Sequence, residues 1–83
     1  MRPSEYLQKW MPIKYGISPN DRGYRTKAII ELEEVTGLSN TSINKWPGLE
    51  SNTGYVLKLL DYADFVNNLG IAMKKYKKIV AKL

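Results

Sequence analysis

The sequence predicts an all-α fold, a compact domain of four to five helices, and three observations support this prediction. Apolar residues recur three and four positions apart over most of the chain, which is the spacing of one helix face. No stretch alternates apolar and polar residues as a half-buried strand does. The 83 residues, 43% of them hydrophobic, suffice for one small domain with a thin core, so residues 1–83 are expected to form a single domain.

Residues 1–23 are expected to form a helix followed by a loop. Ser4 is the predicted N-cap of this helix. Pro12 is expected to stop it, because proline lacks the amide hydrogen that an interior turn of helix needs. Prolines and glycines then recur, which predicts a loop over residues 12–23. The apolar face of the short helix consists of Leu7, Trp10 and Met11.

Residues 24–46 are expected to form two helices joined at a glycine. The first spans residues 24–36, and Gly37 ends it. Ser39 is the expected N-cap of a second, short helix over residues 40–46. The apolar face of the first helix consists of Ala28, Ile29, Leu32 and Val35, and its polar face carries Glu31 and Glu34.

Residues 55–83 are expected to contain the C-terminal helices. An apolar face repeats at helical spacing up to Leu69, and Gly70 is expected to break or bend the helix there. Residues 71–83 then continue as a helix with a basic side. This basic side is interpreted as a solvated face, as an arm that follows phosphates or as a membrane-surface helix; the solvated face is preferred, because the apolar side lacks Trp and Phe. The lysines concerned are Lys74, Lys75, Lys78 and Lys82.

Cysteine and histidine are absent from the sequence. Their absence excludes disulfides, Cys/His zinc sites, thiol nucleophiles and imidazole catalysis. No nucleophile–base pair or metal-ligand set is visible among the remaining residues, so no enzyme activity, cofactor or metal is expected. Apolar runs are far shorter than the roughly 20 residues of a membrane-spanning helix. No apolar segment of a secretory signal follows the first charged residues, so a cytoplasmic protein without a membrane partner is expected.

Charge is distributed unevenly along a chain whose formal net charge is +5. Residues 1–27 contain six basic and two acidic residues, and residues 28–73 contain two basic and six acidic ones. Residues 74–83 contain five lysines and no acid. Two basic ends around an acidic middle indicate a polyanionic partner, although lysines that only keep a small protein in solution explain the same pattern.

The corner at Gly37 is the feature that points to a function. A tight turn between helices requires a residue at positive φ, which glycine supplies without a Cβ clash. Leu38 can fill the space between the helices, while Ile43 and Trp46 lie three residues apart and face inward. The second helix therefore presents a short polar face on an apolar support, as a reader of base edges in the major groove does.

This stretch resembles the helix-turn-helix of small bacterial and phage regulators, in the Cro/repressor-like or Xre-like group. The turn Thr36-Gly37-Leu38-Ser39 is similar to the turn of many such proteins, and Ser42-Ile43-Asn44-Lys45 is similar to a Cro-type recognition helix. The resemblance covers residues 28–46 and extends loosely to residue 71. It implies sequence-specific binding of double-stranded DNA, with a recognition helix at about 39–46 in the major groove.

The candidate DNA-binding residues divide into two groups. Asn44 and Lys45 are expected to read bases, and the residues at the start of the second helix to contact bases, phosphate or the helix's own backbone. The basic residues around the start of the first helix are expected to contact phosphates. The full set is Ser39, Asn40, Thr41, Asn44, Lys45, Arg22, Arg25 and Lys27. Glu33 stands where the family prefers Ala or Gly, so its side chain is expected to reach solvent or to pair with Arg25.

These residues predict a small transcriptional regulator or an accessory protein of a mobile element. A homodimer is possible, because palindromic operators are read by dimers. The alternative is a helical protein-interaction module that does not bind DNA, with Leu57 and Phe65 as its contact surface.

Overall fold

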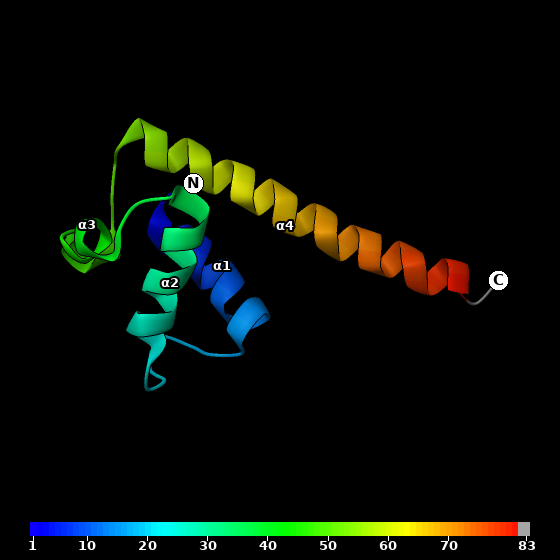
Figure 1. Ribbon diagram of the computed structural model, residues 1–83. Coiled ribbons are helices and arrows are strands. Elements are labelled where there is room, and N and C mark those ends of the chain that lie inside the picture. The colour runs from blue at the N-terminus through cyan, green and yellow to red at the C-terminus, as the bar shows by residue number, and fades with distance from the viewer. Residues whose placement is uncertain (82–83) are drawn as a thin grey trace.

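The computed structural model describes residues 1–81, and within them the all-α prediction is confirmed. These residues form four α-helices, which are labelled in Figure 1, and one 3₁₀ turn. They are α1 (Pro3–Tyr15), α2 (Tyr24–Thr36), α3 (Asn40–Asn44), η1 (Pro47–Leu49) and α4 (Gly54–Ala81). Lys82, one of the lysines expected on the basic side of the last helix, lies outside the described residues.

The core lies where α1, α2 and the first half of α4 meet, with α3 packed against α2. It is built from the apolar faces that the spacing predicts on each element, because burial of these side chains is the main force that holds short helices in place. Within residues 1–81, no helix is long and apolar enough to cross a membrane. The buried apolar side chains are Tyr6, Leu7, Trp10, Met11, Ala28, Ile29, Leu32, Ile43, Leu49, Val56 and Leu60.

Helix α1 differs from its prediction at both ends. Arg2, not Ser4, is the N-cap residue, and both the amide and the hydroxyl of Ser4 donate to the Glu50 carboxylate, at 2.9 and 2.6 Å. Pro12 does not stop the helix, which continues to Tyr15. The extra turn is held because its side chains bond to a buried glutamate on α2, and because Gly16 closes it with φ of 66° and a bond from its amide to the Pro12 carbonyl.

Helix α2 ends at Gly37 and α3 begins after Ser39, as the sequence predicts. Gly37 has φ of 72°, a left-handed conformation, and its amide donates to the Glu33 carbonyl at 2.9 Å. The Ser39 hydroxyl accepts a hydrogen bond from the Ser42 amide at 3.2 Å. Helix α3 ends at Asn44 rather than at residue 46, because Pro47 begins a separate 3₁₀ turn in which Trp46 is the N-cap.

Helix α4 is a single element of 28 residues, so the expected break at Gly70 is wrong. A helix accepts one glycine at about 1 kcal/mol relative to alanine, and the flanking residues are good helix formers. The second half of α4 projects away from the other helices (Figure 1). The radius of gyration is therefore 14.5 Å, and the extents are 51 × 30 × 18 Å. A compact domain of this length has a radius of gyration of about 12 Å, so the expectation of a compact shape is also wrong.

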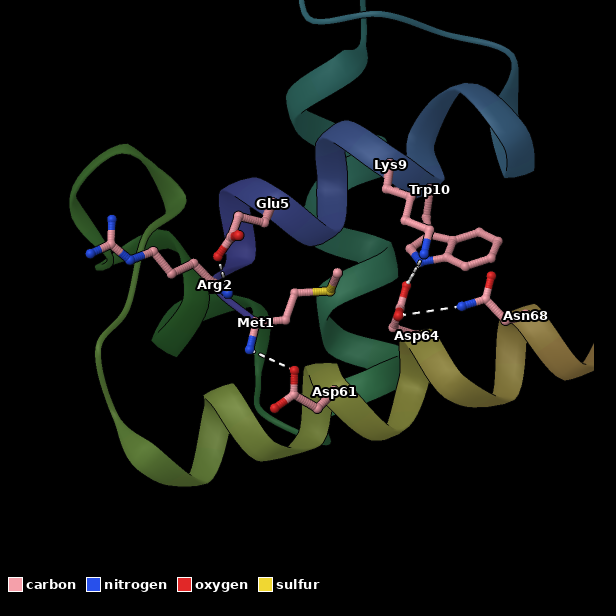
Figure 2. A network of polar contacts seen from close by, with 8 residues as sticks. All are labelled: Met1, Arg2, Glu5, Lys9, Trp10, Asp61, Asp64 and Asn68. Carbon is pink, nitrogen blue, oxygen red and sulfur yellow. Dashed lines mark hydrogen bonds and ion pairs between the residues drawn. The ribbon is translucent and has the colours of Figure 1, made fainter.

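Asp64 on α4 connects α1 and α4 through a polar network (Figure 2). Its carboxylate accepts hydrogen bonds from Lys9 Nζ and Trp10 Nε1, both at 2.8 Å. Asn68 Nδ2, one turn further along α4, lies 3.4 Å from the second carboxylate oxygen. The hydrogen bond from Lys9 holds the pKa of Asp64 below its usual value of 3.8, with a second contribution from the Trp10 hydrogen bond.

Candidate nucleic-acid interface

Helix α3 has one buried side and one exposed side. Ile43 is fully buried in the core, and Leu38 and Trp46 on either side of it are partly buried against the same cluster. These three side chains fix the helix on the body of the protein. The candidate polar side chains of the segment are exposed to solvent, as is Ser42, and the candidates are Ser39, Asn40, Thr41, Asn44 and Lys45. Figure 1 shows α3 nearly end-on while α2 runs along the page, so the two axes differ widely in direction.

Asn44, the last residue of α3, forms side-chain hydrogen bonds to both α3 and α2. Its Oδ1 accepts a hydrogen bond from an Arg25 guanidinium nitrogen at 3.3 Å, and its Nδ2 donates to Asn40 Oδ1 at 2.5 Å. Arg25 therefore places a positive charge beside the exposed face of α3, and it bonds to Asn44 rather than to Glu33. Glu33 itself is half-buried.

The other two basic candidates lie elsewhere. The Lys27 ammonium is 6.0 Å from the centre of the Tyr15 ring, near the end of α1. Positions 25 and 27 project on opposite sides of α2, because two residues turn a helix by about 200°. Arg22 is exposed in the turn before α2. Of the three basic candidates, Arg25 alone is linked by a described contact to α3.

Glu31 was expected on the exposed face of α2, and this prediction is wrong. The side chain is 1% exposed and accepts three hydrogen bonds. Tyr6 Oη donates at 2.5 Å, Lys14 Nζ at 2.7 Å and Tyr15 Oη at 3.2 Å. Asn67 Nδ2 on α4 in turn donates to Tyr6 Oη at 3.0 Å, so the cluster joins three helices.

The two tyrosines of this cluster stay protonated over a wide pH range. Burial raises the pKa of Tyr6 and of Tyr15, and the negative charge and hydrogen bonding of Glu31 raise both further. Each hydroxyl therefore remains a donor to the carboxylate, and within residues 1–81 every buried side-chain nitrogen or oxygen has a hydrogen-bond partner.

The position of Glu31 in the helical repeat of α2 indicates that its side chain can be buried. On a wheel of 100° per residue, Glu31 lies about 60° from Ala28 and only about 40° from Val35, inside the edge of the apolar face. A glutamate at such a position has to find donors from other helices, and the pattern of α2 alone does not identify Lys14 or Tyr6 as those donors. The residues missed by the sequence reasoning are Tyr6, Lys14, Tyr15 and Asn67.

The burial of Glu31 changes the charge around α3. This carboxylate is paired internally with Lys14 and is withdrawn from the surface. Glu34 is exposed, and its negative charge is a minor cause of the raised pKa of Tyr15. One of the three α2 carboxylates, Glu31, is therefore withdrawn from a polyanion that approaches α3.

Within residues 1–81, no group of three or more carboxylates is arranged to hold a metal ion. No family model, no curated protein and no solved structure matches this chain.

Proposed function

We propose that this protein binds double-stranded DNA in a sequence-specific manner, with the segment from Ser39 to Lys45 placed in the major groove. Its role would be that of a small transcriptional regulator or of a mobile-element accessory protein. One observation carries the proposal: the segment from Ser39 to Lys45 exposes its five candidate polar side chains while Ile43 anchors α3 in the core. Amide and ammonium groups on a short, supported helix are the groups that pair with base edges.

The contacts around Asn44 support a division of roles within this surface. Asn44 is oriented by Asn40 and Arg25 before any ligand is present, which lowers the entropy that is lost when its amide pairs with a base. A side-chain amide can form two hydrogen bonds to adenine, and Lys45 can donate to guanine. Arg25 would lie near the phosphates at the edge of the groove.

A selection from random duplexes, followed by titration of the preferred sequence, tests this proposal. Asn44→Ala and Lys45→Ala are each expected to reduce discrimination between the preferred duplex and scrambled duplexes by about 5- to 100-fold, which corresponds to roughly 1–3 kcal/mol for a bidentate base contact. Lys74→Ala is the matched control, because it removes a lysine far from α3. It is expected to weaken all duplexes alike and to leave discrimination unchanged.

The assignment of α3 fails if both α3 variants discriminate as the wild type does. The dependence on salt gives a second criterion. Each phosphate that is neutralised contributes about −0.9 to the slope of log K against log salt, so Arg25→Ala is expected to flatten this slope by about one. A chain that binds no duplex at low salt would overturn the proposal.

The alternative function, a protein-interaction module, is favoured by a different observation. Large apolar side chains are exposed along α4, with Phe65 at 67% exposure. Leu57, the other residue expected in this contact surface, is half-buried. An interaction module would give a flat or absent response in the duplex titration, whereas a DNA reader gives a steep one.

A further inference from the structure

Helix α4 carries an exposed apolar stripe that continues past the body of the protein. The side chains of this outer stripe are Tyr62, Val66, Leu69, Met73, Tyr76 and Val80. Each is between 47% and 68% exposed. Their separations along the chain alternate between four and three residues, so all six lie on one side of the helix.

This alternation is the heptad pattern of helices that pair along their length. Val66, Met73 and Val80 occupy one core position of the repeat, and Tyr62, Leu69 and Tyr76 occupy the other. The flanking positions add Phe65 and Ile79, which are 67% and 62% exposed. A helix that is surrounded by water gains no stability from this spacing of apolar residues over 19 residues.

The outer stripe is separate from the face with which α4 packs on its own domain. Val56 and Leu60 are buried in the core, and Asn67 bonds to Tyr6 on α1. This inner face is centred about 140° around the helix axis from the outer stripe, at 100° per residue. Tyr62 and Val66 border a hollow beside Val35 of α2 and still remain 67% and 61% exposed, so the domain leaves the outer stripe open and both faces can be occupied at the same time.

The exposed side of α4 includes three large aromatic side chains. Three aromatic side chains, Tyr62, Phe65 and Tyr76, are each about two-thirds exposed and together account for on the order of 400 Å² at about 200 Å² each. The aliphatic members of the stripe add to this area. The largest apolar patch of a typical monomer is about 300–600 Å² in total, while a stable dimer buries roughly 800 Å² on each partner.

The distribution of lysines along α4 favours pairing with a second copy in reverse. The second half carries Lys74, Lys75, Lys77 and Lys78, whereas the carboxylates of the first half, Asp61 and Asp64, are paired within the chain with the N-terminus and with Lys9. Antiparallel pairing keeps the two lysine-rich halves apart, whereas parallel pairing sets them side by side. The second half also has little packing of its own, and a helix of this length is marginal in water without a partner.

From the spacing, the area and the charges together, we infer that the outer stripe pairs with the outer stripe of a second copy of this chain, in antiparallel orientation. The inference does not depend on the proposed DNA contact, because α3 and the outer stripe share no residue. An experiment can therefore contradict the pairing of α4 and leave the proposed DNA contact of α3 intact, or the reverse.

Sedimentation velocity over a range of protein concentrations tests the pairing. The wild type is expected to shift from one to two chains with concentration. Leu69→Lys is expected to weaken self-association by at least about tenfold, because an ammonium group would enter the apolar seam. Asn68→Lys is the matched control: it introduces the same charge at the neighbouring position, outside the stripe, and is expected to change self-association by less than about twofold.

Circular dichroism of each variant distinguishes a loss of pairing from a loss of folding. Met73→Lys provides a second variant on the outer stripe. Leu69 is half exposed in the single chain, so its replacement is expected to leave the body folded. A wild type that stays one chain at all concentrations overturns the inference. So does a Leu69→Lys variant that pairs as the wild type does.

Because the natural chain has no cysteine, introduced thiols report the orientation directly. Tyr62→Cys mixed with Val80→Cys is expected to form a disulfide-linked pair on mild oxidation, because these positions meet when the helices run in opposite directions. Val80→Cys alone is expected to stay unlinked. Efficient linkage of Val80→Cys to itself would overturn the antiparallel orientation.

Discussion

The first and second halves of α4 belong to one uninterrupted helix and yet have opposite relations to the rest of the molecule. In the first half, Leu60 is fully buried and Asp64 bonds to two side chains of α1. In the second half, beyond the half-buried Ile71, every described side chain is exposed. The comparison shows that helical spacing identifies an apolar face on a helix. It does not tell whether other residues of the same chain bury that face.

The largest expected effect comes from making the same substitution in both halves. Leu60→Ala is expected to lower the free energy of unfolding by about 2–5 kcal/mol, because it leaves a cavity in the core. Leu69→Ala is expected to change it by less than about 0.5 kcal/mol at concentrations where the protein is a single chain. Urea unfolding followed by circular dichroism measures both, and similar losses would contradict the division of α4 into packed and free halves.

The next effect concerns the buried cluster of α2. Lys14→Met is expected to destabilise the protein by about 1–3 kcal/mol, because the Glu31 carboxylate loses its cationic partner while it stays buried. Lys14 is partly exposed, so water replaces some of the lost interaction. The double variant Lys14→Met, Glu31→Gln is expected to recover part of the loss in the same urea assay. A double variant less stable than the single one would show that the ion pair is not the source of the effect.

A smaller effect, dependent on pH, comes from the Asp64 network. Because the folded pKa of Asp64 is lowered, its contribution to stability is present above the usual value of 3.8 and is lost as the pH falls through the lower folded value. Asp64→Asn is expected to cost about 1 kcal/mol at pH 7. The difference from the wild type should shrink as the pH falls below 3.8. A difference that stays constant between pH 7 and pH 3 would show that Asp64 acts without its charge.

The smallest effect lies at the junction of the two halves. Gly70 has open space around its Cβ position and a helical conformation, so Gly70→Ala meets no neighbour. It is expected to raise helix content and to stabilise the second half of α4 by up to about 1 kcal/mol. Amide hydrogen exchange of the residues after Gly70 measures this locally. Faster exchange in the variant would indicate that the glycine is required for a bend.

The sequence predicts the helices and the Gly37 corner well, because capping and spacing are local properties. Ser39 caps α3 and Ile43 is buried, as the pattern of those few residues requires. The continuation of α1 past Pro12 and of α4 through Gly70 could not be predicted in this way, because tertiary bonds and helix formers on both sides outweigh one unfavourable residue. DNA binding by α3 stays a prediction.

The candidate site could be predicted from the sequence only in part, because contacts between helices also contribute to it. The exposed residues of α3 follow from its own sequence. The link between Arg25 and Asn44 joins residues 19 positions apart, and the bonds to Glu31 from Tyr6 and Lys14 span 25 and 17 positions. Such pairings depend on how helices cross, which the period of a single helix does not encode.

The two hydrogen bonds from Ser4 attach Glu50, which follows η1, to the first turn of α1. Leu49, the residue before Glu50, is buried in the core. The chain that leaves α3 is therefore anchored at two neighbouring residues, once by apolar burial and once by hydrogen bonds. Ser4→Ala would remove one of the two bonds to Glu50 and leave the buried Leu49 in place.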